Sequence, residues 1–282
     1  GADWYVRQMK QQAYQSDPLP LKNMNEAFIS RNAFVRVDPN YSARDPELNL
    51  HSLPGSGLTA DGKPIMMLSE AMKIAARPVP YGNGVMPSEN LYLPVDSQAL
   101  GQAFGDSAKV HVRRTIDLSL AGKGILSLAD LSVLDLIANN EWKRPIYWAI
   151  TSPNNSFSNL PDYLRQTGMA NQFVPFKARR VGDNIDVEKT YTNVMTKFRF
   201  GGANNPKVYF DADIRNSTNT YRVAVFSPLA KALLERGDTV RARKVLTKCL
   251  QEISPEAVPY DYRSLVLAQP CTMQIWWPTQ TG

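Results

Sequence analysis

Residues 127–150, SLADLSVLDLIANNEWKRPIYWAI, constrain the fold more than any other stretch of the chain. Ser127 is followed three residues later by Asp130, which is typical of a helix start. The hydroxyl can accept a hydrogen bond from an unpaired amide, and the acid lies in the first turn. Apolar residues then recur at helical spacing on most sides of the segment. The pattern predicts a buried helix that begins at Ser127.

The second half of this stretch predicts a turn and a strand. Asn139 and Asn140 are expected to form the turn, because asparagine tolerates the left-handed conformation that ends helices. Pro145 prevents the helix from continuing. The apolar run at residues 146–150 is rich in β-forming residues, and it predicts a strand covered on both faces, as in a parallel sheet with helices packed on it.

Periodicity elsewhere predicts an α/β fold. Strands are expected at residues 32–37, 90–96, 109–120 and 172–178, and Pro94 suggests that the second of these is an edge strand or contains a bulge. Helices are expected at residues 3–14, 64–76, 97–104, 160–168, 186–200, 222–236 and 239–253, and a polar loop at 203–220. We therefore expect a mixed or mostly parallel sheet with flanking helices.

The last two expected helices contain the sequence ALLERGDTVRARKVL, which resembles the antiparallel helix pair of a tetratricopeptide-type repeat. One such pair is not a repeat array, since about three repeats are needed for a self-standing solenoid. We expect an α/β domain at residues 1–215 followed by a tetratricopeptide-like helical hairpin at 216–282.

Composition and charge exclude several classes of protein. No run approaches the roughly 18 apolar residues of a membrane span. The net charge is +6, from 32 basic and 26 acidic residues, and the basic residues are scattered. Nucleic-acid binders concentrate basic residues in a stripe interleaved with aromatic residues, so we expect no nucleic-acid partner. Because the chain starts with Gly1, we expect it to be a piece of a longer protein.

The sequence contains no catalytic or metal-binding motif, and we predict no cofactor. Only two histidines are present, His51 and His111, and neither Cys249 nor Cys271 belongs to a CxxC pair. A zinc site is therefore not expected. Cys249 shares a helical face with apolar residues and is interpreted as a small buried side chain, although a disulfide with Cys271 stays open for an oxidising compartment.

Five residues are candidate binding residues. Asp117 is the only acid inside the strongest strand pattern. It could be a buried functional acid, although Thr115 and Ser119 beside it favour a solvent-facing position. The other four combine aromatic rings with cations and could stack a sugar or hold an anion: Trp142, Lys143, Arg144 and Tyr147. Helix-end charges next to core aromatic residues are the favoured interpretation of this group.

Three stretches carry a family resemblance. The first is Asp3-Trp4-Tyr5 with Gln8-Met9, Ala13-Tyr14, Ser16 and Leu19-Pro20. The other two are Trp142-Lys143-Arg144-Pro145-Ile146-Tyr147, after the predicted helix, and Val258-Pro259-Tyr260-Asp261-Tyr262. Together they resemble the C-terminal soluble region of a bacterial multi-pass membrane family of unknown function. That family is related to protein O-mannosyltransferases of the GT-C class. The resemblance extends from residue 3 to about residue 268, and the tail after Gln269 departs from it.

The resemblance implies a function for the chain. It implies a domain on the periplasmic face of a bacterial inner membrane, beside an N-terminal membrane domain that would bind the sugar donor and carry the catalytic acid. No family catalytic residue maps onto this sequence. We therefore expect an accessory domain that binds an acceptor protein or glycan and is not catalytic alone. The alternative is a free-standing α/β enzyme acting on a sugar or sugar nucleotide, with Asp117 and the Trp142–Tyr147 cluster at the ends of the strands.

Overall fold

The computed structural model describes residues 3–13, 15–30, 34–40, 55–77, 84–96, 114–152, 159–177 and 184–270. The contacts divide the chain into two compact units, one of residues 1–145 and 153–161, the other of residues 146–152 and 162–282. Each unit is described by itself. The helix expected at 97–104, the first part of the strand expected at 109–120, both histidines and Cys271 lie outside the described residues.

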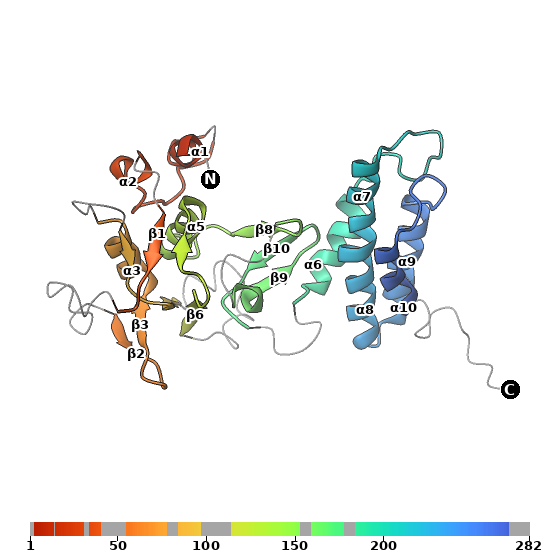
Figure 1. Ribbon diagram of the computed structural model, residues 1–282. Coiled ribbons are helices and arrows are strands. Elements are labelled where there is room, and N and C mark those ends of the chain that lie inside the picture. Colours follow the sequence, from red (N-terminus) through yellow and green to blue (C-terminus); the bar gives the residue numbers. More distant parts are fainter. Residues whose placement is uncertain are drawn as a thin grey trace. The chain divides into compact units, whose positions relative to one another are not determined.

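The described part of the first unit contains two small mixed sheets (Figure 1). In one sheet, β1 (Val35–Val37) pairs parallel with β4 (Val85–Met86) and antiparallel with β7 (Ile125–Leu126). The other sheet has the order β2 (Ser56–Leu58), β3 (Pro64–Met67), β5 (Asn90–Pro94) and β6 (Thr115–Ser119). Only the β3–β5 pair of that sheet is parallel. The sheets are therefore mixed rather than mostly parallel.

The described residues of the first unit form the helices α1 (Asp3–Met9), α2 (Glu26–Ser30), α3 (Leu68–Ala75) and α5 (Leu128–Asn139). Helix α3 packs against α5 and against strands of both sheets. The predicted start of α5 is confirmed, because Ser127 Oγ accepts a hydrogen bond from the Asp130 amide at 3.2 Å and Asp130 Oδ2 accepts one from the Ser127 amide at 3.0 Å. The predicted burial of α5 holds for Leu131 and Leu134, among others.

Three local predictions in the first unit are wrong. Residues 64–67 form β3 rather than the start of a helix, because two neighbouring strands supply backbone partners. Pro94 is the last residue of β5, which lies between β3 and β6 and so is not an edge strand. The pairing of β5 with β6 skips no residue, so there is no bulge at Pro94 either. The left-handed residues of the turn after α5 are Glu141 and Trp142, with φ of 50° and 59°, and not Asn139 or Asn140.

The second unit begins with a sheet of three antiparallel strands, in the order β8 (Tyr147–Ala149), β10 (Ala170–Phe173) and β9 (Leu164–Gln166). A short 3-10 helix, η4 (Leu160–Tyr163), precedes β9, so the helix expected at 160–168 is wrong beyond Tyr163. The strand expected at 146–150 is present, but it is an edge strand with Tyr147 50 % exposed, so its predicted burial on both faces is wrong.

Helices form the rest of the second unit. The segment α6 (Val187–Thr192) runs into a π-helix, η5 (Asn193–Lys197), and α7 (Ala212–Tyr221) runs through a second π-helix, η6 (Arg222–Phe226), into α8 (Ser227–Glu235). A turn leads to α9 (Thr239–Glu252), followed by η7 (Tyr262–Leu267) and α10 (Ala268–Pro270). Figure 1 shows α7 and α8 as one long rod with α9 beside it. Helix α7 occupies residues 212–220, the second half of the predicted loop at 203–220, so the loop prediction is wrong for that half.

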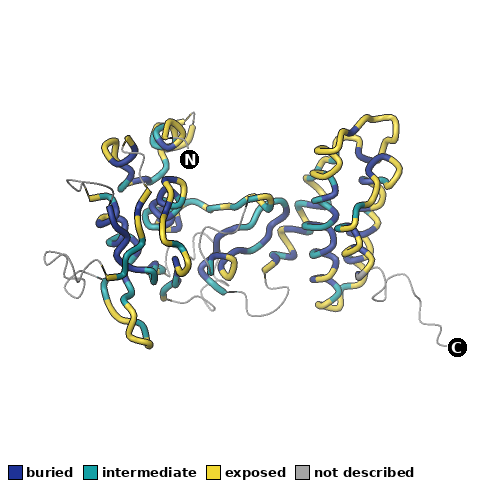
Figure 2. Tube along the Cα trace, viewed as in Figure 1, coloured by how far each residue is buried: buried dark blue, intermediate teal, exposed yellow. Residues whose placement is uncertain are grey.

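One hydrophobic core unites these helices. It includes Ile185, Val187 and Val194 as well as the inner faces of α8 and α9. The buried face of α9 contains Cys249, as predicted. The expected domain boundary after residue 215 falls within α7. The contacts instead divide the chain near residues 146 and 162. Residues 185–210 join the later unit because several of them pack in the core of its helices. Figure 2 shows the buried inner side of α8 and the exposed loop that precedes α7. The α/β class with a helical C-terminal region is confirmed.

Candidate binding surfaces

Asp117 lies in the middle of β6, opposite Tyr92 of the antiparallel neighbour β5. Its flanking residues Ile116 and Leu118 are buried, so the half-buried Asp117 side chain points to the other face of the sheet. The backbone oxygen of Asp117 accepts a hydrogen bond from Asn159 Nδ2 at 2.7 Å. Neither of the two grooves described below includes Asp117. Its role in binding stays a prediction.

Trp142 is buried at the turn after α5, with 9 % of its surface exposed. Two hydrogen bonds close the turn. The Lys143 amide donates to the Asn140 carbonyl oxygen at 2.9 Å, and Asn140 Nδ2 donates to the Arg144 carbonyl oxygen at 2.7 Å. Two successive non-glycine residues with positive φ make this a strained turn. The buried indole ring and these hydrogen bonds hold the turn in place.

The two cations of this turn both contact other groups of the first unit. Lys143 Nζ lies 2.5 Å from a Glu141 carboxylate oxygen. Arg144 Nη2 donates to the Asp17 carbonyl oxygen at 2.9 Å and lies 3.8 Å from the Asp17 carboxylate. Tyr147 belongs to β8 of the second unit. The five predicted residues are thus divided between the two units, four in the first and Tyr147 in the second.

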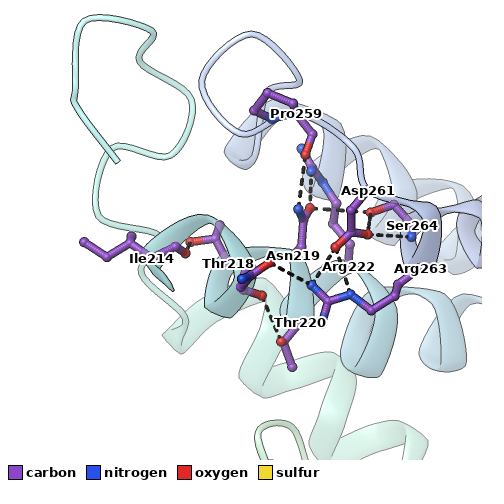
Figure 3. Close-up of polar contacts among 10 residues, drawn as sticks. Ile214, Thr218, Asn219, Thr220, Arg222, Pro259, Asp261, Arg263 and Ser264 are labelled. Carbon is purple, nitrogen blue, oxygen red and sulfur yellow. Dashed lines mark hydrogen bonds and ion pairs between the residues drawn. The ribbon is translucent and has the colours of Figure 1, made fainter. Parts of the chain in front are cut away.

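A buried arginine organises the C-terminal helices of the second unit. Arg222 is only 1 % exposed. Its guanidinium donates to Asn219 Oδ1 at 2.5 Å and to the Ile253 carbonyl oxygen at 2.9 Å, and it lies 4.4 Å from the centroid of the Tyr260 ring. Asn219 Nδ2 donates to the Pro259 carbonyl oxygen at 3.1 Å (Figure 3). One side chain therefore ties the α7–α8 rod to the end of α9 and to the segment after it.

Burial and hydrogen bonding shift the pKa values of this cluster in different ways. Burial lowers the pKa of Arg222, because the charged form loses its water, but an arginine stays charged at neutral pH. Burial alone would raise the pKa of Asp261, yet hydrogen bonds from Arg263 and Ser264 outweigh it, so the pKa is lowered overall. Ionised Asp261 caps η7 by accepting the Ser264 amide at 3.0 Å (Figure 3).

An apolar groove of about 300 Å³ lies between α9 and the segment that the Arg222 cluster holds. Leu246 and Leu250 form the α9 wall, and Tyr260, Leu265 and Ala268 contribute to the other wall. Leu265 is 70 % exposed. The groove is an exposed apolar surface of a kind that proteins use for contacts with partners.

A larger groove of about 620 Å³ follows the outer face of α9. Its basic side chains are Arg243, Lys244 and Lys248, and its one acid is Glu252. The neutral polar lining residues from α9 are Thr239, Thr247 and Gln251, and Met195 of η5 contributes from outside that helix. Below, this surface is called the cationic groove. It can bind an anionic group or an elongated anionic chain.

Sequence reasoning missed both grooves and the Arg222 cluster. An arginine within a helical pattern suggests an exposed residue, and the burial of Arg222 depends on residues about 30 to 40 positions later in the chain. The one available signal was Val258-Pro259-Tyr260-Asp261-Tyr262, a stretch of the resemblance, which supplies the Pro259, Tyr260 and Asp261 contacts.

Other acids of the sequence have structural roles. Asp211 caps α7 by accepting the Ile214 amide at 2.8 Å, and Asp213 lies in the first turn of that helix. Among the residues that the structure describes, no group of three His, Cys, Asp or Glu side chains is placed to hold a metal ion.

Comparison with known families gives a match over most of the chain. The family model described as TMEM260-associated domain 2 matches residues 1–192, about two thirds of the chain. The chain belongs to this family. The match covers the whole first unit, together with the sheet and α6 of the second, and it ends where the π-helix η5 begins. The Arg222 cluster and the lining residues of both grooves lie beyond the matched part of this TMEM260-associated domain. No curated protein and no solved structure matches the chain.

Proposed function

We propose that this chain is an accessory domain of a membrane glycosyltransferase-like protein, and that it binds the acceptor, a polypeptide or a glycan, without carrying out the transfer itself. The observation that carries the proposal is the family match over residues 1–192. TMEM260 is described as an O-mannosyltransferase-like protein. A domain associated with such a protein has a natural role in holding the molecule that receives the sugar.

The geometry of the second unit supports a binding role. Two grooves flank α9, one apolar and one cationic, and both open to solvent. The Arg222 cluster fixes one wall of the apolar groove, so that wall is formed before any ligand arrives. A preformed groove binds with a smaller entropic cost than a surface that must first become ordered.

The proposal includes a location and a partner. We place the chain on the periplasmic face of a bacterial inner membrane, beside the N-terminal membrane domain of the same protein, and relate that protein to the GT-C class through the resemblance in its sequence motifs. No helix among the described residues has the length and apolar character needed to cross a bilayer.

The proposal is tested by thermal denaturation of the purified chain with a panel of mono- and oligosaccharides and unfolded peptides. A ligand at about 100 times its Kd stabilises the folded state by about 2.7 kcal/mol. For a protein of this size the melting temperature should then rise by roughly 5–10 °C. No shift with any sugar or peptide would overturn the proposed binding role. Turnover of a sugar substrate by the chain alone would favour the free-standing enzyme instead.

A further inference from the structure

The cationic groove is formed by one face of a single helix. Its lining residues on α9 recur at spacings of three and four from Thr239 to Glu252, which places them along one side of the helix. Thirteen steps of 1.5 Å give this face a length of about 20 Å. Arg243, Lys244 and Lys248 supply three positive charges along it, against the single negative charge of Glu252.

Within the lining of this groove, Glu252 is the one acidic side chain. Lys248 Nζ lies 3.3 Å from Glu252 Oε1, so Lys248 has one acidic neighbour on its own helix. The pair is half-buried, with 20 % and 38 % of the two side chains exposed, so it still borders solvent and an incoming carboxylate can compete for the lysine. Thr239, Thr247 and Gln251 add neutral groups that can donate or accept hydrogen bonds. The groove therefore complements a chain with several negative charges and polar backbone groups.

We propose that the cationic groove binds an acidic segment of the acceptor polypeptide in an extended conformation. About six residues at roughly 3.3 Å each span the length of the α9 face. Carboxylates on alternate residues point to the same side of an extended chain, toward the three cations. The inference rests on the proposed function, from which it takes a polypeptide acceptor as the ligand. What it adds is that the bound segment carries acidic side chains.

Other anions fit the groove less well. A single phosphate binds best at a free helix N-terminus, but here the Asp238 carboxylate accepts the Arg241 amide at 2.9 Å and places a negative charge at that end. A nucleic acid strand calls for aromatic side chains on which bases stack, and the lining residues are not aromatic. An anionic bilayer calls for a protruding basic surface, whereas these side chains line a hollow.

The test measures the binding of labelled eight-residue peptides to the whole chain by fluorescence anisotropy. A Ser-Glu repeat is compared with a Ser-Gln repeat of equal length at about 50 mM and 300 mM salt. The groove variant is Lys244→Glu/Lys248→Glu. The matched control is Lys207→Glu/Lys231→Glu, which has the same net charge and alters two exposed lysines outside the groove. Lys244→Gln/Lys248→Gln is a milder variant, in case the reversed charge next to Glu252 perturbs α9.

The expected result has three parts. The Ser-Glu peptide binds at least about tenfold more tightly than the Ser-Gln peptide at low salt, and the preference shrinks at high salt because exposed charges are screened. The groove variant weakens Ser-Glu binding by about tenfold or more, since two attractive contacts become repulsive. The glutamine variant weakens it less, and the control stays within about twofold of the native protein.

Several results would overturn the inference. Equal affinity for the Ser-Glu and Ser-Gln peptides would overturn it, although the proposed binding of polypeptides would stand. An equal loss of Ser-Glu affinity in the groove variant and in the control would also overturn it. If sugars bind and neither peptide does, the acidic polypeptide is ruled out as the ligand, and the proposed function stands with a glycan as the acceptor. Binding to vesicles with anionic lipid, with no competition from the Ser-Glu peptide, would identify a membrane surface instead. If no sugar, peptide or vesicle in the panel binds, both proposals are refuted.

Discussion

Replacing Arg222 with leucine tests the central contact of the second unit. The variant leaves the Ile253 carbonyl oxygen without its donor at 2.9 Å, and leaves Asn219 Oδ1 with only Ser264 Oγ at 3.5 Å. Each buried polar group that loses its partner costs roughly 1–3 kcal/mol, and the lost contact with the Tyr260 ring costs about 1–2 kcal/mol more. Removal of the buried cation offsets part of this destabilisation, because the folded state no longer carries the cost of taking a charge out of water. We expect a net loss of about 3 kcal/mol in the free energy of unfolding.

The loss is measured by urea denaturation, followed by circular dichroism at 222 nm, which reports the helices. With an m-value of about 2 kcal/mol/M, a loss of about 3 kcal/mol moves the midpoint down by roughly 1.5 M. The control is Arg215→Leu, an exposed arginine of α7, for which we expect a change within about 0.5 kcal/mol. A midpoint that moves no further for Arg222→Leu than for Arg215→Leu would refute the stabilising role of the buried guanidinium.

Three further variants test the first unit. Glu141→Gly should raise the free energy of unfolding by about 1 kcal/mol, because the φ of 50° strains any residue with a Cβ, and a lower urea midpoint would contradict this. Gly84→Ala should destabilise by at least about 2 kcal/mol, since its Cβ would lie 1.9 Å from the Ala75 carbonyl oxygen, and an unchanged melting temperature would show that the backbone yields easily. Burial raises the pKa of Asp135 although Asn23 donates to it, so the folded state binds the proton more tightly than the unfolded state does. The stability of the native protein relative to Asp135→Asn should therefore increase as the pH falls from the raised pKa to the ordinary carboxyl value, and urea titrations that give one constant difference between pH 7 and pH 4 would exclude this.

The parts of the fold that could be predicted depend on neighbours in the sequence. The capping box at Ser127 forms within four residues, so its pattern alone predicts the start of α5. The burial of Ile116 and Leu118 follows from strict alternation in β6. In α9, Val245 and Cys249 are buried at the predicted helical spacing. In each case one local period determines which side of the element is covered.

The parts that could not be predicted depend on distant partners. Residues 64–67, PIMM, suit a strand or a helix equally, and β2 and β5 decide between the two through backbone pairing. Helix α7 has a polar sequence, and of its side chains only Asn219 is buried, so no apolar stripe marks it as a helix. The apolar groove arises where α9 meets the segment that follows it in the chain, and no local pattern encodes such a meeting.

The π-helix η6 also limits how this protein can change length during evolution. In η6 the Ser227 amide donates to the carbonyl oxygen of Arg222, five residues back, and the Ala224 carbonyl oxygen accepts Gln166 Nε2 at 2.5 Å. A π-turn is equivalent to a one-residue insertion in an α-helix. Deleting one residue there would restore ordinary helical hydrogen bonds but rotate everything downstream by about 100°, which would turn Leu229 and Leu233 out of the core. Relatives that keep this core should therefore conserve the number of residues between Asn219 and Leu229 more strictly than the residues themselves.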